Sequence, residues 1–247
     1  MSKLVVIDPG HGGHDPGASG YGLLEKNSTL DLALQVGKVL QDRYVVRVEW
    51  TRTTDAFVSL TDRATLANRL KADYFISLHH NAYDGNARGF ESYIFSGKVN
   101  PFTGNAQKLI HVEIMQALKP YGVVDRGTKR ADFAVLRETV MPALLVEYLF
   151  IDNAQDNALL QNLSVRQAMV EATARGIARV LGLSEKPDRQ KAQGPSQTAD
   201  KIYRVQVGAF RDRRNAERLL KKLKSLGFKD AMITETLAPP SDENQTN

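Results

Sequence analysis

Three short apolar runs, each followed by a side chain of a metal-binding type, constrain this 247-residue chain more than any other feature. They are Lys3–His11, Tyr74–His79 and Ala143–Glu147. Short apolar runs of this kind are typical of buried strands in a parallel sheet. Because the carboxyl ends of parallel strands meet at one edge of an open α/β sheet, the two histidines and the glutamate are expected to meet there. The pattern predicts a metal-dependent hydrolase.

Residues 1–183 alternate between strand-like and helix-like segments, which predicts an α/β domain with a mostly parallel twisted sheet flanked by helices. Ser59 and Asp62 form a variant of the capping box, so a helix should follow them. Further strands are expected at 44–50 and 90–95, and further helices from about Ser28, at about 103–118 and at about 164–181.

The amino-acid composition limits which side chains could bind a metal. The chain has no cysteine, which excludes disulfides and thiolate metal sites, so a metal would be held by histidines and carboxylates, a donor set that suits zinc. No segment reaches the roughly 18 apolar residues of a membrane span, so no membrane partner is expected. Met1-Ser2-Lys3 leads straight into the first strand, so we expect no signal peptide and synthesis in the cytoplasm.

The composition changes after the first domain. Residues 184–199 contain two prolines and no apolar period, which predicts a linker. Residues 200–236 then follow a βαβ pattern, with strands expected at 203–207 and 231–234 around a helix from about Asp212 to Gly227. The tail, 237–247, is expected to be disordered.

This end segment is basic: between 200 and 236 it contains ten Lys and Arg residues but only five Asp and Glu residues. An excess of positive charge favours a polyanionic partner, with nucleic acid and an anionic cell wall as alternatives, although a solvated helix face explains the charge equally well. No recognised nucleic-acid motif accompanies the charge, so nucleic acid is not the expected partner.

Two histidines and a carboxylate match a catalytic zinc set that leaves one position for water, and the candidates are His11, Glu25 and one residue of the pair His79-His80. Taken singly, a histidine after a strand is more often a hydrogen-bonding loop residue, and the helix dipole alone would explain Glu25. Neighbouring residues of a strand point to opposite faces, so only one of that pair can face the site. Glu147 lies in an apolar strand and needs a partner or a metal to offset its desolvation, which makes it a candidate general base. The other histidines are poorer candidates: His14 lies in the same short loop as His11, and His111 is expected at the surface.

Several motifs in residues 1–183 closely resemble the zinc-dependent N-acetylmuramoyl-L-alanine amidases of the Amidase_3 group. The matching segments are Ile7–Gly13, Gly22–Glu25, Ser59–Arg63 with Ala67-Asn68, Ser77–Ala82, Gly89–Tyr93, Asp125–Lys129, Val135–Arg137 and Met141–Glu147.

The resemblance implies one zinc ion on His11, Glu25 and His79, with Glu147 as the catalytic glutamate. The family pattern Ser-x-His-x-Asn selects His79 over His80. The implied reaction cleaves the amide between N-acetylmuramic acid and L-alanine in bacterial peptidoglycan. Asn81 and Arg63 are candidate substrate-binding residues, although structural hydrogen bonding explains both equally well.

The segment 200–236 resembles half of a SPOR peptidoglycan-binding domain, with Gln206 and Phe210 as candidate wall contacts. A lone βαβ half has an exposed edge and a thin core, so the alternatives are that two chains pair through it as a homodimer or that the half-module binds the wall weakly.

An enzyme of this kind without a signal peptide would reach the wall after lysis, as a phage endolysin or a mother-cell amidase of sporulation does. The alternatives are a zinc peptidase that cuts another stem-peptide bond and a non-catalytic wall-binding protein.

Overall fold

The structure is a computed structural model that describes residues 2–187, 210, 212–225, 228 and 231–234. The chain divides into two units, Met1–Arg189 and Gln190–Asn247, and each is described by itself. Among the described residues no helix is long and apolar enough to cross a membrane.

The first unit is built on a six-stranded sheet with the order β4-β1-β5-β8-β6-β7. All neighbouring strands are parallel except β6 and β8, which run antiparallel. The carboxyl ends of β1, β5 and β8 therefore lie at the same edge as the amino ends of β6 and β7. The strands are β1 (Lys3–Pro9), β4 (Val46–Trp50), β5 (Tyr74–Asn81), β6 (Phe90–Phe95), β7 (Asp125–Ala131) and β8 (Ala143–Phe150). The predicted mostly parallel sheet is confirmed.

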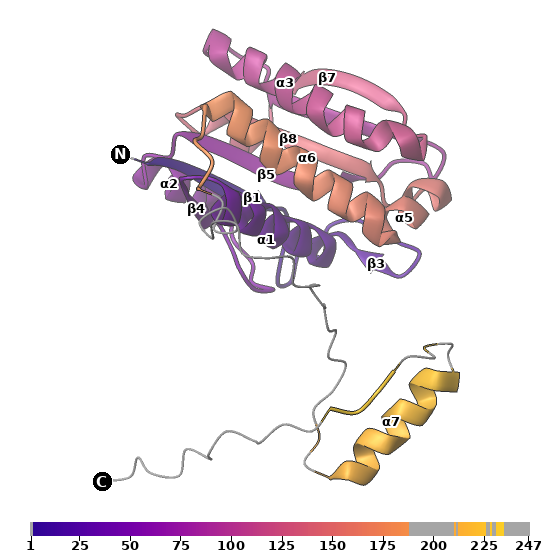
Figure 1. The fold of residues 1–247 in the computed structure, drawn as a ribbon. Helices are drawn as coiled ribbons and strands as arrows, with labels where there is room; N and C mark the ends of the chain where they lie inside the picture. Colours follow the sequence, from indigo (N-terminus) through magenta and orange to yellow (C-terminus); the bar gives the residue numbers. More distant parts are fainter. Residues whose placement is uncertain (1, 188–209, 211, 226–227, 229–230, 235–247) are drawn as a thin grey trace. The chain divides into compact units, whose positions relative to one another are not determined.

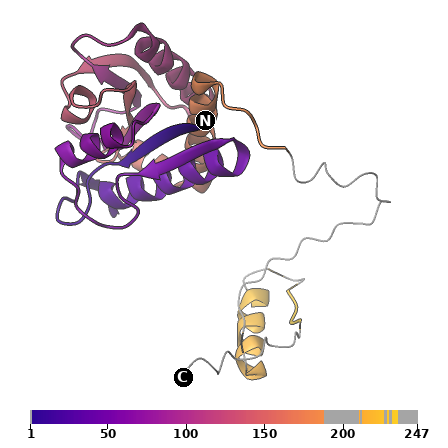
Figure 2. The same ribbon diagram turned by 90° about the vertical axis from the view of Figure 1, so that its left-hand side faces the viewer.

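Helices cover both faces of the sheet, and Figures 1 and 2 show α6 on one side and α2 on the other. The thicker layer holds α1, α6 and α3, with α6 packed between the other two (Figure 1). The helices are α1 (Glu25–Arg43), α3 (Pro101–Leu118) and α6 (Leu163–Leu181) in the thicker layer, and α2 (Leu60–Arg69) and α4 (Ala134–Arg137) on the opposite face.

The sheet separates two apolar cores of unequal size. Ile76 and Leu78 pack into the large core against the thicker helix layer, whereas Phe75 packs into the smaller core with α2 and α4. Side chains alternate along a strand, so His79 points to the same face as Phe75. The short helices α2 and α4 do not cover this face at the carboxyl ends of β1, β5 and β8. Polar side chains lie there instead, and they form the candidate site.

The helix starts follow local sequence rules. The Ser59 hydroxyl accepts a hydrogen bond from the Asp62 backbone N–H at 3.1 Å, which caps α2 as expected. Helix α1 begins earlier than predicted, at Glu25 instead of about Ser28, and its cap position, Leu24, makes no side-chain bond. Glu25 is thus the first residue of the helix, where the helix dipole favours a negative charge.

Several short elements carry no strong periodic signal, and the sequence did not predict them. They are the hairpin β2 (Ser19–Gly20) and β3 (Leu23–Leu24), the 3₁₀ turn Lys119–Tyr121, α4 and α5 (Ala154–Gln161). The polar strand β7 was also missed.

The first unit extends a little past the predicted start of the linker. The Val45 backbone N–H donates to Ser184 O at 2.9 Å, and the Lys186 N–H donates to Arg43 O at 2.7 Å. Residues 188–199 of the predicted linker lie outside the described residues.

In the second unit the predicted helix is present as α7 (Arg213–Ser225). The strand expected at 231–234 stays a prediction: among the described parts of the chain these residues form no ladder, and Ala231 donates its N–H to Phe228 O. A short strand forms only when a neighbouring strand accepts its hydrogen bonds. The expected partner strand, 203–207, and the tail, 237–247, lie outside the described residues.

Candidate active site

The side chains of His11, Glu25 and His79 converge at the carboxyl edge of the sheet. Glu25 Oε1 lies 3.1 Å from His11 Nε2 and 3.0 Å from His79 Nδ1. One donor atom from each residue falls within 4.8 Å of the others. Ligand bonds of about 2.0–2.1 Å in a tetrahedral site place neighbouring donors about 3.3 Å apart, so this spacing is close to that of a metal site.

Glu25 is held in a charged state by its surroundings. It is 3% exposed, and its Oε2 accepts the Ala18 N–H at 2.9 Å while its Oε1 accepts the His80 N–H at 2.9 Å. Burial opposes ionisation, but hydrogen bonds and charge interactions with His11 and His79 outweigh it, so the pKa of Glu25 lies far below its usual value. The carboxylate is therefore ready to bind a cation.

The loop that carries His11 is fixed from behind. His11 has a left-handed backbone conformation (φ 62°). Its Nδ1 lies 2.9 Å from Asp15 Oδ2, so the other ring nitrogen, Nε2, is the one that points toward Glu25. The buried Arg63 donates to Asp8 Oδ1 and to the Pro9 and His11 carbonyls at 2.7–2.8 Å. A carboxylate on the outer nitrogen of a histidine is the usual support of a metal ligand. Arg63 thus positions the loop, and a contact between Arg63 and substrate stays a prediction.

These residues fit a zinc ion. The set offers two imidazole nitrogens and one carboxylate oxygen, which is a common catalytic donor set with one position open. The spacing of the donors and the outer hydrogen bond of His11 agree with that use.

The neighbouring histidines have other roles. His80 points to the opposite face, where its ring nitrogens lie 2.6 Å from Tyr148 O and 2.8 Å from Ser28 Oγ, and burial lowers its pKa to about 4. His14 is exposed and packs its ring against Phe57, outside the cluster. The prediction that only one residue of the pair faces the site agrees with this geometry.

The surface position predicted for His111 is wrong. His111 is 4% exposed, and its ring nitrogens lie 2.9 Å from Ser92 Oγ and 2.9 Å from Asp125 Oδ1. Asp125 begins β7, the strand that the sequence did not predict, so the partner that permits burial of His111 was not foreseen.

Glu147 lies beside the cluster on the same face. It is registered opposite His79 on β5 and opposite Glu91 on β6. Its Oε2 is buried and has no hydrogen-bond partner among the described residues. Burial raises the pKa of Glu147 well above its usual value, and the negative charges of Glu25 and Glu91 add to the rise. A carboxylate with a raised pKa is a stronger base than a solvated one.

A second polar cluster, formed by Glu91 and its four donors, adjoins Glu147. Glu91 Oε1 accepts from Asn81 Nδ2 and from the Tyr93 hydroxyl, each at 2.6 Å. Glu91 Oε2 accepts from Arg126 Nε at 2.7 Å and from Lys129 Nζ. Burial opposes ionisation of Glu91, but hydrogen bonds from Lys129, Tyr93 and Arg126 lower its pKa to about 2.

The sequence assigned no role to Glu91, Arg126 or Lys129. All three lie in segments that match the amidase motifs, Gly89–Tyr93 and Asp125–Lys129, and that membership is the signal that could have found them. Asn81, a predicted substrate-binding residue, lies in this cluster as a donor to Glu91.

We expect Glu91→Gln to remove a pH-dependent part of the stability. The pKa of Glu91 is lower in the folded state than in the unfolded chain, so Glu91 stabilises the fold above pH 4.5 and loses this effect as the pH falls toward 2. The stability difference between wild type and variant should therefore shrink by about 1–2 kcal/mol between pH 6 and pH 3. Urea unfolding at both pH values measures it, and a difference that does not vary with pH would refute the ion-pair account.

We expect Gly10→Ala to displace the ring of His79. A Cβ at this position would lie 2.3 Å from His79 Cε1, and the Gly10 backbone is held by hydrogen bonds to Leu78, Thr29 and Arg52. The ring must therefore move, and zinc affinity should fall roughly 10- to 100-fold, as it does when the support of a metal ligand is removed. Gly104→Ala in α3 meets nothing within 4 Å and serves as the control. Equal zinc affinities in a competition titration would contradict this prediction.

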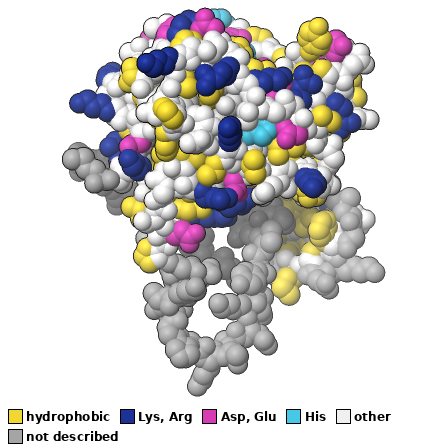
Figure 3. All heavy atoms as spheres, turned by 90° about the horizontal axis from the view of Figure 1, so that it is seen from above, with side chains coloured by type: hydrophobic (Ala, Val, Ile, Leu, Met, Phe, Trp, Pro, Cys, Tyr) yellow, Lys and Arg dark blue, Asp and Glu magenta, His cyan; other side chains and the backbone are white. Residues whose placement is uncertain are grey.

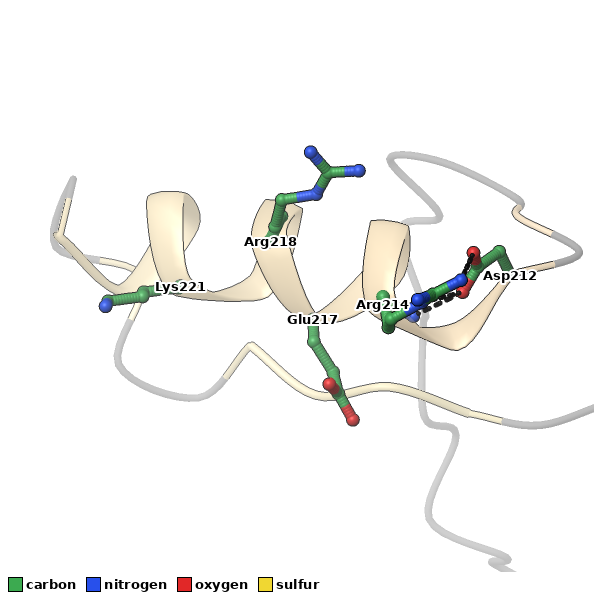
Figure 4. Close-up of a pocket in the computed structure, with 5 residues that line it drawn as sticks. All are labelled: Asp212, Arg214, Glu217, Arg218 and Lys221. Atoms are coloured by element: carbon green, nitrogen blue, oxygen red, sulfur yellow. Dashed lines mark hydrogen bonds and ion pairs between the residues drawn. The ribbon is translucent and has the colours of Figure 1, made fainter.

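The second unit presents a shallow, open hollow along α7. Asp212, Arg214, Glu217, Arg218 and Lys221 line it, and Figure 4 shows Asp212 bonded to Arg214 while Lys221 points away from them. Asp212 Oδ2 lies 3.0 Å from Arg214 Nη2. All five lining side chains are of charged types, and the hollow lies in the other unit from the His11–Glu25–His79 cluster. Of the predicted wall contacts, Phe210 is 47% exposed and Gln206 lies outside the described residues.

The mostly parallel α/β sheet, with a His-carboxylate-His cluster at the carboxyl ends of β1 and β5, defines a hydrolase domain with a candidate metal centre. Residues 5–179 match the Amidase_3 family, N-acetylmuramoyl-L-alanine amidase, and residues 199–240 match the SPOR domain. The chain belongs to the Amidase_3 family, as its motifs predicted.

Similar proteins agree with this assignment. The endolysin of Bacillus phage SPP1 is 46% identical over 187 residues, which cover 75% of this chain and 69% of that protein. The sporulation-specific N-acetylmuramoyl-L-alanine amidase of Bacillus subtilis is 40% identical over 230 residues, which cover 93% of this chain and 84% of that protein. The solved catalytic domain of CwlV, an N-acetylmuramoyl-L-alanine amidase from Paenibacillus polymyxa, is 33% identical with a TM-score of 0.68, over 74% of this chain and 99% of that domain.

Proposed function

We propose that residues 1–183 form a zinc-dependent amidase domain that hydrolyses the bond between N-acetylmuramic acid and L-alanine in peptidoglycan. The observation that carries the proposal is the convergence of His11, Glu25 and His79 with Glu147 beside them, in a chain of the Amidase_3 family.

The proposed mechanism divides the work between the zinc site and Glu147. His11, Glu25 and His79 would hold the zinc ion, which would supply a lowered pKa of water and polarisation of the lactyl carbonyl. Glu147 accepts a proton from the water as the water oxygen bonds to the lactyl carbonyl carbon, and returns it to the amide nitrogen of L-alanine as the carbon–nitrogen bond breaks. The raised pKa of Glu147, caused by burial, makes this carboxylate a better proton acceptor than a solvated one.

We propose that residues 184–199 link this domain to a wall-binding half-module, 200–236, followed by a tail, 237–247. The SPOR match and the excess of basic residues support this division. Gln206 and Phe210 are the proposed wall contacts. The enzyme would act on the cell wall after release from the cell that makes it, in phage lysis or in mother-cell lysis.

We also propose that two chains pair through their half-modules. A half-module with a single helix can bury little apolar surface within one chain. Ala216, Leu219 and Leu223 form an apolar stripe on α7 that is only partly buried, and this stripe is the proposed pairing surface. Sedimentation of the full chain tests it: a dimer that becomes a monomer when residues 200–247 are removed supports pairing, and a full-length monomer at micromolar concentration sinks it.

Digestion of purified peptidoglycan by the full chain, with and without a zinc chelator, tests the enzymatic proposal. Mass spectrometry should find new L-alanine amino termini and peptide-free muramic acid, both lost on chelation and restored by zinc. New ends elsewhere in the stem peptide would indicate a zinc peptidase. No new ends at all would favour the non-catalytic wall-binding protein.

A further inference from the structure

The Glu91 cluster contains more positive charge than its own carboxylate requires. Glu91 is 3% exposed and is bound by two cations, although one would neutralise it. The side chains of Arg126 and Lys129 are 33% and 37% exposed, so each reaches from buried Glu91 to solvent. The cluster therefore carries a net charge of about +1 at the open edge of the site, because the pKa of Glu91 is held low by its partners.

Both cations keep donors for another group. Lys129 Nζ has three hydrogens and, among the described residues, one acceptor, Glu91. Arg126 uses Nε on Glu91, and its Nη2 has no acceptor in the described part of the chain. The Arg126 guanidinium also lies 4.9 Å from the centre of the Phe150 ring, which restricts its position. Two oriented cations with unused donors match a carboxylate ligand.

The strand register places this cluster in line with the proposed reacting centre. His79 on β5, Glu147 on β8 and Glu91 on β6 are consecutive register partners, and Arg126 lies on β7, the next strand. Neighbouring strands are about 4.8 Å apart, so the cations lie about 5–10 Å from Glu147 across the sheet. Figure 3 looks down on the edge of the domain formed by β7 and α3, where Lys and Arg side chains are numerous.

This distance selects one group of the proposed substrate. An extended peptide advances about 3.3–3.6 Å per residue, so a substituent on the second stem residue lies about 7 Å from the scissile amide. When that residue is a glutamate linked through its side chain, its free α-carboxylate lies at this distance. Carboxylates on the third or later residues lie about 10 Å or more away.

We propose that Lys129 and Arg126, oriented by Glu91, bind the free α-carboxylate of the second stem-peptide residue and so make the enzyme prefer stems in which this group is not amidated. The inference rests on the proposed amidase function and assigns these residues as substrate contacts.

The test uses the full, zinc-loaded chain and two soluble muramoyl tripeptides that differ only in a carboxylate or a carboxamide at the second residue. Wild type should prefer the carboxylate in kcat/KM by roughly 10- to 100-fold, the range of a charged hydrogen bond. Lys129→Gln should lower kcat/KM for the carboxylate substrate about 10-fold and that for the carboxamide less than about 3-fold. Lys129→Arg should restore the preference.

Arg130→Gln is the matched control, because Arg130 is on the same strand but bonds to Phe95 O and Gly97 O at the far end of β6. An equal loss on both substrates in Lys129→Gln would mean a structural role and would overturn the proposal, as would a wild type that does not discriminate. Calorimetry with the free stem tripeptides tests the carboxylate-binding site separately from the proposed amidase reaction. If neither substrate is cleaved but the carboxylate peptide binds more tightly than the carboxamide, the proposed reaction fails and the carboxylate site stands.

Discussion

Glu147→Gln is expected to lower the rate of amide cleavage by roughly 100- to 10,000-fold, the usual contribution of a general acid–base residue. Glutamine has nearly the shape of glutamate but cannot take up a proton at neutral pH. Because Glu147 Oε2 is buried with no partner among the described residues, a neutral side chain should not weaken the fold. The measurement is the rate at which new amino termini appear in purified peptidoglycan. Zinc content and pelleting with the wall should be unchanged.

Glu49→Gln is the control for this variant, because Glu49 is an exposed glutamate on the edge strand β4. Its rate should equal that of wild type. An unchanged rate in Glu147→Gln would remove Glu147 from the mechanism. A loss of zinc together with activity would instead make Glu147 part of the metal site.

His79→Ala is expected to weaken zinc binding by at least about 100-fold and to abolish cleavage. The substitution leaves two of three donors, and Glu25 also loses the imidazole that lies 3.0 Å from its Oε1. Competition with a chromophoric chelator measures the affinity, and elemental analysis gives the zinc per chain. Added zinc in excess should restore little activity, because the position of the reacting water depends on all three ligands.

His14→Ala tests whether the effect belongs to this cluster. His14 is close to His11 in sequence but is exposed and packs against Phe57 outside the cluster. This variant should keep both zinc and activity. If His79→Ala retained full zinc affinity, the proposed ligand set would be wrong.

Strong local signals were enough to predict much of the fold. The apolar runs of β1, β5 and β8 predict buried strands, and the capping residue Ser59 predicts the start of α2. By contrast, β7 has the polar sequence DRGTKRA and lies at the sheet edge, so no burial pattern marks it. The error at His111 has the same origin, because its partner Asp125 belongs to that strand.

Some residues of the candidate site could also be predicted from the sequence, and others could not. Motifs and residue types were enough to propose His11, Glu25, His79 and Glu147, because metal binding and proton transfer require particular side chains. The link between Glu147 and the Glu91 cluster depends on the antiparallel pairing of β6 with β8, which no local pattern encodes.

Residue chemistry and strand periodicity in the linear chain therefore determined the class of fold, the family and the candidate ligand and base residues. The tertiary structure alone decided which side chains share the open face, that Arg63 lies buried behind the His11 loop, and that Arg126 and Lys129 converge on Glu91. The physical reason is that side-chain identity is local, whereas strand order and register arise from the packing of segments far apart in the chain.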